Sequence, residues 1–326
     1  MYSEVIVLQE TTLIQVPQRL TVLEAVEFRK TCQELCQADT VPDKIIFDFS
    51  DTTFMDSSGL GALVSNFKLT KDKGIELLLR DVRPQVMAVL SLTGLNEVLP
   101  IEQTVSTEAE KTTEQSEIVP PPTHPSIYSW IKRSLDLVGS IVGLIITGIL
   151  FIPIAIAIKL DSPGPIFFGQ IRCGWMGKRF RIWKFRSMYI DAEARKAEVE
   201  NQLGDNKLFK SAKDPRITKV GQFLRRTSLD ELPQFWNVLK GEMSLVGTRP
   251  PTPDEVEQYE VPEWQRLDVK PGMTGEWQVS GRSQIRNFED VIRLDLKYQE
   301  NWSLMYDLQL IFKTIFVVFN KNSGAY

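Results

Sequence analysis

Short apolar runs alternate with longer amphipathic stretches through the first hundred residues. Strand-like runs occur at KIIFDF (44–49) and IELLLRDV (75–82). Helical patterns surround them at 21–38, 56–74 and 84–95, and the middle one ends at a glycine, a common helix stop. Strands that alternate with helices predict a small α/β domain over residues 1–100.

Residues 101–126 have a different composition. The segment is polar and acidic, and it ends in a cluster of prolines. Such a composition cannot bury enough apolar surface to fold by itself, so we predict a linker between two domains.

The next feature is LVGSIVGLIITGILFIPIAIAI (137–158), 22 residues without a charged side chain. That length is sufficient to span a bilayer, although a buried core helix is the alternative. Lys132 and Arg133 precede the run and Lys159 follows it. Pro153 removes one amide donor, so it predicts a kink or a break in the helix.

Residues 127–326 form the predicted second domain. After the apolar run come an Arg/Lys-rich stretch at 170–186, a helical pattern near 190–203, and a segment rich in proline and glycine. The final apolar stretch, 304–320, could pack in a core or lie on a membrane surface.

Charge and reactive residues narrow the chemistry. The net charge is −4 overall, but residues 127–326 carry +5, which suits anionic substrates or lipid headgroups. The three cysteines, Cys32, Cys36 and Cys173, form no paired framework and are expected to be buried thiols of a reducing compartment.

His124, in the linker, is the only histidine. A catalytic Ser-His or Cys-His pair is therefore not expected, and neither is a histidine-rich metal site. Any nucleophile should be a carboxylate, and any metal should be one that prefers oxygen ligands.

TSLDELPQ (227–234) places two acids, Asp230 and Glu231, side by side. The spacing from Ser228 to Glu231 fits a capping box at a helix start. Catalysis is the competing interpretation, because an aspartate can attack a phosphate when cations neutralise the phosphate charge. The candidate cations are Lys184, Arg186, Arg225, Arg226 and Arg249.

Four long stretches of the second domain resemble the bacterial sugar transferases, the monotopic phosphoglycosyl transferases. They are DSPGPIFFGQIRCGWMGKRFRIWKFRSM (161–188), DPRITKVGQFLRRTSLDELPQFWNVLKGEMSLVGTRP (214–250), KPGMTGEWQVSGRS (270–283) and NWSLMYDLQLIFKTIFVVFNKNSGAY (301–326). The resemblance implies a membrane-embedded, mainly α-helical core with a re-entrant helix at 135–160. It also implies transfer of a sugar-1-phosphate from a UDP-sugar to polyprenyl (undecaprenyl) phosphate, with release of UMP, a covalent aspartyl intermediate and Mg²⁺ as cofactor.

The resemblance assigns roles to individual residues. Asp230 matches the nucleophile and Glu231 the metal-binding carboxylate beside it. Lys184, Arg225 and Arg249 match residues that hold the substrate phosphates, and we add Arg186 because it lies two residues from Lys184. Pro153 marks the break of the re-entrant helix, without the serine that precedes the proline in the family.

Residues 1–100 resemble a STAS domain, the fold of anti-sigma-factor antagonists, through FDFSDTTFMDSSGLGALV (47–64) after a strand. The resemblance makes Ser57, with Ser58 beside it, a candidate for regulatory phosphorylation. Alternatively, either serine simply caps the helix that follows.

Together these features predict an enzyme that starts exopolysaccharide or other glycan assembly on a lipid carrier. The expected location is the bacterial inner membrane, with both domains facing the cytosol. Expected partners are the UDP-sugar, the polyprenyl phosphate, the membrane, and a STAS-binding protein or kinase. A homo-oligomer is left open, and no nucleic acid is expected. The alternative is a membrane-tethered regulatory scaffold with an inert transferase core.

Overall fold

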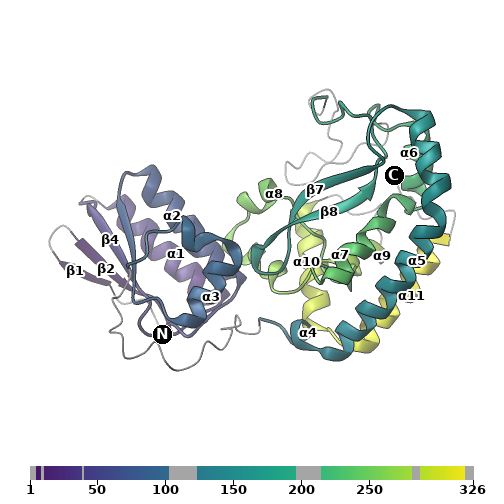
Figure 1. The fold of residues 1–326 in the computed structure, drawn as a ribbon. Coiled ribbons are helices and arrows are strands. Elements are labelled where there is room, and N and C mark those ends of the chain that lie inside the picture. Colours follow the sequence, from purple (N-terminus) through teal and green to yellow (C-terminus); the bar gives the residue numbers. More distant parts are fainter. Residues whose placement is uncertain are drawn as a thin grey trace, which may run out of the picture. The chain divides into compact units, whose positions relative to one another are not determined.

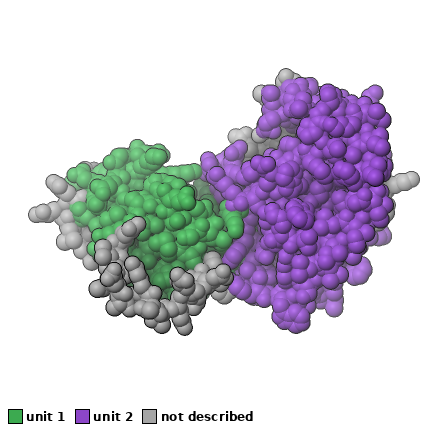
Figure 2. Space-filling model, in the orientation of Figure 1, with its two compact units in different colours: residues 1–123, 176–178, 259–268 green, residues 124–175, 179–258, 269–326 purple. Residues whose placement is uncertain are grey.

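The computed structural model describes residues 5–8, 11–38, 40–102, 123–195, 214–280 and 287–319. The chain divides into two compact units (Figure 2). Unit 1 contains residues 1–123, 176–178 and 259–268, and unit 2 contains residues 124–175, 179–258 and 269–326.

A four-stranded sheet forms the base of unit 1. Its strands are β1 (Val5–Leu8), β2 (Thr11–Gln15), β4 (Lys44–Asp48) and β6 (Glu76–Arg80), in the order β1-β2-β4-β6. The β1–β2 pair is antiparallel and the other pairs are parallel. Ile14, Phe47 and Leu79 lie in one register across the parallel strands and are fully buried. Apolar central strands of this kind are typical of a parallel sheet covered by helices.

Helices α1 (Val22–Gln37), α2 (Ser57–Asp72) and α3 (Pro84–Thr93) accompany the sheet (Figure 1). Shorter elements are β3 (Arg19–Leu20), β5 (Phe54–Met55) and η1 (Leu95–Glu97). The buried face of α1 includes Phe28, Cys32 and Cys36, at the four-residue spacing of one helix face. The predicted α/β fold and the predicted burial of all three cysteines are confirmed.

The predicted linker begins later than the sequence suggested. Ile101 bridges Leu79 of β6, and the Glu102 amide donates to the Leu79 carbonyl at 2.8 Å. These two residues therefore extend the sheet. Residues 103–122 of the predicted linker lie outside the described residues.

Unit 2 is mainly helical, as predicted. In chain order its elements are α4 (Pro125–Tyr128), α5 (Trp130–Asp161), β7 (Phe167–Cys173), β8 (Arg179–Phe185), α6 (Lys219–Arg226), η5 (Leu229–Gln234), α7 (Phe235–Lys240), β9 (Ser244–Val246), α8 (Pro253–Glu257), β10 (Gly272–Thr274), α9 (Glu276–Val279), α10 (Phe288–Glu300) and α11 (Leu304–Phe319). Strands β7 and β8 form an antiparallel hairpin, whereas β9 and β10 are parallel. Of the helix expected near 190–203, residues 190–195 form a turn, and residues 196–203 lie outside the described part of the chain.

Helix α5 contains the apolar run and is 32 residues long. Its most apolar 18-residue window has a mean hydropathy of 2.8 and is only 17% buried, so length and composition allow it to cross a membrane. Large apolar side chains along it are exposed, among them Val138, Ile141, Ile145, Ile149, Ile152, Ile156 and Leu160. The alternative of a buried core helix is therefore excluded.

The opposite side of α5 packs on protein through small residues. A Cβ at Gly139 would lie 2.5 Å from Leu245, and one at Gly143 would lie 2.4 Å from the Phe235 ring. Of the two outcomes expected at Pro153, a kink or a break, the break is not found, because α5 continues through Pro153 to Asp161 as one helix (Figure 1). A proline removes only one amide donor, and a long helix can absorb that loss as a kink.

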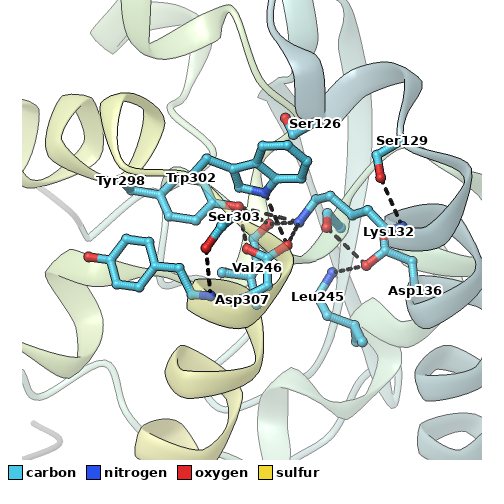
Figure 3. A network of polar contacts seen from close by, with 12 residues as sticks. Ser126, Ser129, Lys132, Asp136, Leu245, Val246, Tyr298, Trp302, Ser303 and Asp307 are labelled. Atoms are coloured by element: carbon cyan, nitrogen blue, oxygen red, sulfur yellow. Dashed lines mark hydrogen bonds and ion pairs between the residues drawn. The ribbon is translucent and has the colours of Figure 1, made fainter.

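A buried polar network joins α5 to α11 and β9 (Figure 3). Lys132 Nζ lies 2.6 Å from Asp307 Oδ2 and also donates to the Val246 carbonyl at 3.0 Å. Tyr298 Oη and Trp302 Nε1 donate to the same carboxylate, at 2.8 and 3.2 Å. Lys132 is thus half of a buried ion pair rather than a surface charge beside the apolar run.

Helix α11 has two faces. Leu310 and Asp307 are fully buried, whereas Met305, Phe312, Ile315 and Phe316 are exposed. The final apolar stretch therefore contributes to the core and also presents an apolar surface.

Candidate active site

The acid pair lies in η5, between α6 and α7. The predicted capping box is absent: Ser228 has φ 55° and ψ 17°, and its side chain caps nothing. A capping residue needs extended backbone to aim its hydroxyl at the free amides, and the left-handed conformation of Ser228 prevents this. Positive φ at a non-glycine residue is uncommon and often occurs at functional sites.

Arg225, at the end of α6, lies within electrostatic reach of both acids. The Asp230 side chain is buried, with 6% of its residue surface exposed. Burial lowers the pKa of the Arg225 guanidinium, and the attraction of Asp230, Asp214 and Glu231 opposes that effect. Ser187 Oγ accepts from Arg225 Nε at 2.9 Å and so orients the group. Arg225 is half-buried, and a cation with a perturbed pKa beside the acid pair is a candidate site for an anionic substrate.

Lys184 contacts the second acid directly. Its Nζ lies 2.8 Å from Glu231 Oε1, and both side chains are partly exposed. The contact joins β8 to η5 and brings together two residues that are 47 positions apart. The structure therefore gathers Asp230, Glu231, Lys184 and Arg225, as the sequence predicted.

Arg249 makes a two-pronged ion pair with Glu255, at 2.8 and 3.0 Å. Arg172 lies within electrostatic reach of Arg249 and Glu255, and also of Glu231. Burial, with repulsion from Arg249, lowers the pKa of Arg172 to about 10. Arg172 and Glu255 were missed by sequence reasoning, and for Arg172 the available signal was its position in the resembling stretch 161–188.

Arg186 has a different role from the one expected. It is buried, and it donates to the carbonyl oxygens of Pro163 and Ser162 at 2.7 Å each. A Cβ at Gly164 would lie 2.0 Å from its Nη1. The guanidinium thus fixes the turn after α5, and its contacts give no support to binding of substrate phosphate.

The two candidate serines, Ser57 and Ser58, open α2 and are completely buried. Neither is the helix cap, because Asp56 Oδ1 accepts from the Gly59 amide at 2.9 Å. The interpretation that a serine caps this helix is wrong.

The donor set at the acid pair is compatible with Mg²⁺. Within the described ranges, no three histidine, cysteine or acidic side chains gather as a ready-made metal site. Mg²⁺ commonly takes only one or two carboxylates from protein and completes its shell with water and substrate phosphates. Asp230 and Glu231 fit that pattern.

Comparison with known proteins identifies both parts of the chain. The bacterial sugar transferase family matches residues 127–321. The chain belongs to this family. The STAS domain family matches residues 2–108, so both resemblances found in the sequence are confirmed.

Individual relatives share the transferase region. The galactosyl transferase CpsE of Streptococcus agalactiae is 51% identical over 189 residues, which cover 57% of this chain and 42% of the relative. The undecaprenyl-phosphate galactose phosphotransferase of Salmonella typhimurium is 45% identical over 206 residues, or 60% and 42% of the two chains. The exopolysaccharide production protein ExoY of Sinorhizobium fredii is 40% identical over 192 residues, or 56% and 83%. The chain thus spans less than half the length of the first two relatives.

Proposed function

We propose that this protein transfers a sugar-1-phosphate from a UDP-sugar to undecaprenyl phosphate and thereby starts the assembly of a polysaccharide. The observation that carries the proposal is the acid pair Asp230–Glu231, held beside Lys184 and Arg225 in a member of the sugar transferase family. The names of two relatives, a galactosyl transferase and an undecaprenyl-phosphate galactose phosphotransferase, support this reaction class.

The first step is attack by an Asp230 carboxylate oxygen on the phosphorus that carries the sugar. A new P–O bond to Asp230 forms, the P–O bond to the UMP oxygen breaks, and its electron pair leaves with UMP. Arg225 and Lys184 offset the negative charge that otherwise repels a carboxylate from a phosphate. In the second step an oxygen of undecaprenyl phosphate attacks the same phosphorus, and Asp230 leaves as a free carboxylate.

Glu231, with Asp230, would hold Mg²⁺, and the bound ion would supply further charge neutralisation at the substrate phosphates. Arg249 and Arg172 are proposed to bind the distal part of the diphosphate; the ion pair of Arg249 with Glu255, and the position of Arg172 near both, support this role. A charge-assisted pair of this kind holds a guanidinium in one plane, which favours two-pronged binding of phosphate.

A membrane location follows from the apolar surfaces. The acceptor is a lipid, and the exposed apolar side chains of α5 and α11 form the surface that would face lipid. Both ends of α5 are hydrogen-bonded to the rest of unit 2, which favours a monotopic arrangement, in which the helix enters and leaves the same face of the membrane. Near its start, Arg133 donates to the Val238 and Leu239 carbonyls at 2.8 and 2.7 Å. At its end, Asp161 accepts from the Val220 amide at 2.9 Å.

A helix that crosses the bilayer has its ends on opposite sides, and one compact unit cannot hold both. We therefore propose that α5 enters and leaves by the cytoplasmic face, where UDP-sugars are made. Single cysteines at Tyr128 and Pro165, both exposed positions, test this in spheroplasts. Both should resist an impermeant thiol reagent until the cells are permeabilised. Labelling of position 128 alone from outside would mean that α5 spans the membrane.

The STAS domain is proposed to regulate the transferase by binding a protein partner or by phosphorylation at Ser57. A phosphate would add about −1.5 to −2 charge at the start of α2, where the helix dipole favours an anion.

Turnover is tested with purified protein in detergent, undecaprenyl phosphate and a panel of UDP-sugars, with release of UMP as readout. We expect acceptor-dependent UMP release with at least one sugar. Arg225→Ala should lose most of this activity, whereas its exposed neighbour changed as Arg226→Ala should keep it. No UMP release with any UDP-sugar, or equal rates for the two variants, would contradict the proposal.

A further inference from the structure

Unit 1 contains a short segment that the sequence assigns to the transferase. Residues 259–268, called here the docking segment, fall within the match to the sugar transferase family, and so do residues 176–178 at the turn of the β7–β8 hairpin. By their contacts both belong to unit 1, together with the STAS domain (Figure 2, green). The docking segment is built on η6 (Val261–Leu267).

The docking segment covers the start of α2. The Ser57 amide donates to Asp268 Oδ1 at 2.9 Å, and the Ser57 hydroxyl lies 3.2 Å from the Met176 sulfur. Ser57 and Met176 are fully buried as a result. The Asp268 carboxylate therefore occupies the position at the positive end of α2 that a phosphate on Ser57 would need.

Trp264 supplies the main apolar contact. A Cβ at Gly61 would lie 2.5 Å from the Trp264 ring, so the indole sits directly on the glycine of α2. Trp264, Val261 and Leu267 are all buried. An ion pair between Arg29 of α1 and Glu260 adds a polar contact at the edge. Glycine at position 61 leaves the space that the indole fills.

We propose that the STAS surface around Ser57 is a docking site occupied by the chain's own residues 259–268, so that docking excludes both modification of Ser57 and binding of another protein there. The inference rests on the proposed function only in taking the STAS domain as regulatory. What it adds is that residues 259–268 of the same chain occupy the surface around Ser57. Met176 lies in the turn that connects β7, which carries Arg172, to β8, which carries Lys184. The contact at Ser57 is therefore linked through the chain to two residues of the candidate active site.

The test measures how accessible position 57 is in the full chain. Ser57→Cys is treated with a thiol reagent, and labelling of each cysteine peptide is followed by mass spectrometry. With the segment docked, Cys at 57 should react far more slowly than Cys at the exposed Lys71 of the same helix. Cys32 and Cys36, in the core of the sheet and α1, report on unfolding because they react only if unit 1 opens.

Two variants open the contact from opposite sides. Gly61→Ala favours the helix itself, but its methyl overlaps the indole, so labelling at 57 should rise roughly tenfold or more. Trp264→Ala removes the indole and should act in the same direction. The exposed tryptophan changed as Trp236→Ala is the matched control and should leave labelling at 57 slow.

Rapid labelling at 57 in the parent would overturn the proposal. Labelling that stays slow in both Gly61→Ala and Trp264→Ala would do the same. If Gly61→Ala also makes Cys32 and Cys36 reactive, its effect is unfolding of unit 1. The labelling of Trp264→Ala then decides whether the docking proposal holds, because Trp264 lies outside the residues matched by the STAS family. The readout involves no turnover, so failure of the docking proposal is distinguishable from failure of the transferase proposal, which is read from UMP release.

Discussion

The buried ion pair between Lys132 and Asp307 allows a stability prediction with a defined size. Lys132→Met keeps a side chain of similar length but leaves Asp307, which is fully buried, without its cation. Removal of one partner of a buried pair costs about 3–5 kcal/mol, because an uncompensated charge stays behind. Tyr298 and Trp302 still donate to the carboxylate, so we expect a loss near the lower limit, about 3 kcal/mol.

Thermal unfolding in detergent measures the loss. For a unit of about 200 residues, 3 kcal/mol corresponds to a fall in Tm of roughly 6–12 °C. The double variant Lys132→Met/Asp307→Leu removes both charges and should recover most of that loss. Lys159→Met, at an exposed position of the same helix, is the control and should change Tm little. A fall of less than about 2 °C in Lys132→Met, or a double variant less stable than both singles, would refute the reasoning.

Two further predictions concern carboxylates. Glu231→Gln keeps the shape of the side chain but removes its charge. Turnover should therefore fall roughly 10–100-fold, and a higher Mg²⁺ concentration should be needed for half-maximal turnover. If turnover and the Mg²⁺ titration are both unchanged, Glu231 has only a structural role. Docking should also depend on pH, because two acids at the contact have raised pKa values. Burial raises the pKa of Asp56 to about 6; Glu24 adds to the rise and Arg19 opposes it. Burial, with repulsion from Asp56, raises the pKa of Asp268 to about 7. Raised acid pKa values stabilise the docked state at low pH and lose that effect as pH rises through 6 and 7. Labelling of a thiol at position 57, divided by that of a thiol at position 71 to remove the thiol's own ionisation, should therefore increase between about pH 5.5 and about pH 8. A constant ratio would show that these acids do not control docking.

Sequence patterns predicted the features that depend on local periodicity. The alternation of strands and helices in residues 1–100 was sufficient for a small α/β domain, and the resemblance of residues 47–64 identified it as a STAS domain. The uncharged run at 137–158 was sufficient for a long lipid-compatible helix. The acid pair was a candidate because an aspartate near several cations can attack a phosphate, and the resemblance to the sugar transferases assigned the roles of Asp230 and Glu231. Lys184 and Arg225 lie beside the acids as expected.

Features set by distant contacts were not predicted. The spacing from Ser228 to Glu231 fits a capping box, but spacing cannot reveal that Ser228 is left-handed. Lys132 resembled a flanking charge because its partner, Asp307, lies 175 residues away. Arg186 and Arg172 are both arginines near the site in sequence. Only the fold shows that Arg186 donates to the Pro163 and Ser162 carbonyls at the turn after α5, whereas Arg172, which donates to Gln170 and the Pro250 carbonyl, lies near Arg249, Glu255 and Glu231.

Residues 259–268 illustrate the same limit at the level of domains. The segment lies inside the transferase match, yet Trp264 and Asp268 contact α2 of the STAS domain. The available sequence signal for this was the glycine at position 61, in the second turn of α2, where glycine costs about 1 kcal/mol relative to alanine. A contact with another side chain explains that cost.

Covalent catalysis by Asp230 is the central claim, and intact-protein mass spectrometry tests it most directly. The protein is incubated with its UDP-sugar and no lipid acceptor, so that the second step cannot occur. We predict that the parent and Asp191→Asn, a control at an exposed position, each gain the mass of one sugar phosphate. Asp230→Asn should gain none and should lose turnover by about a thousandfold or more. The same adduct on Asp230→Asn, or turnover close to that of the parent, would contradict the account.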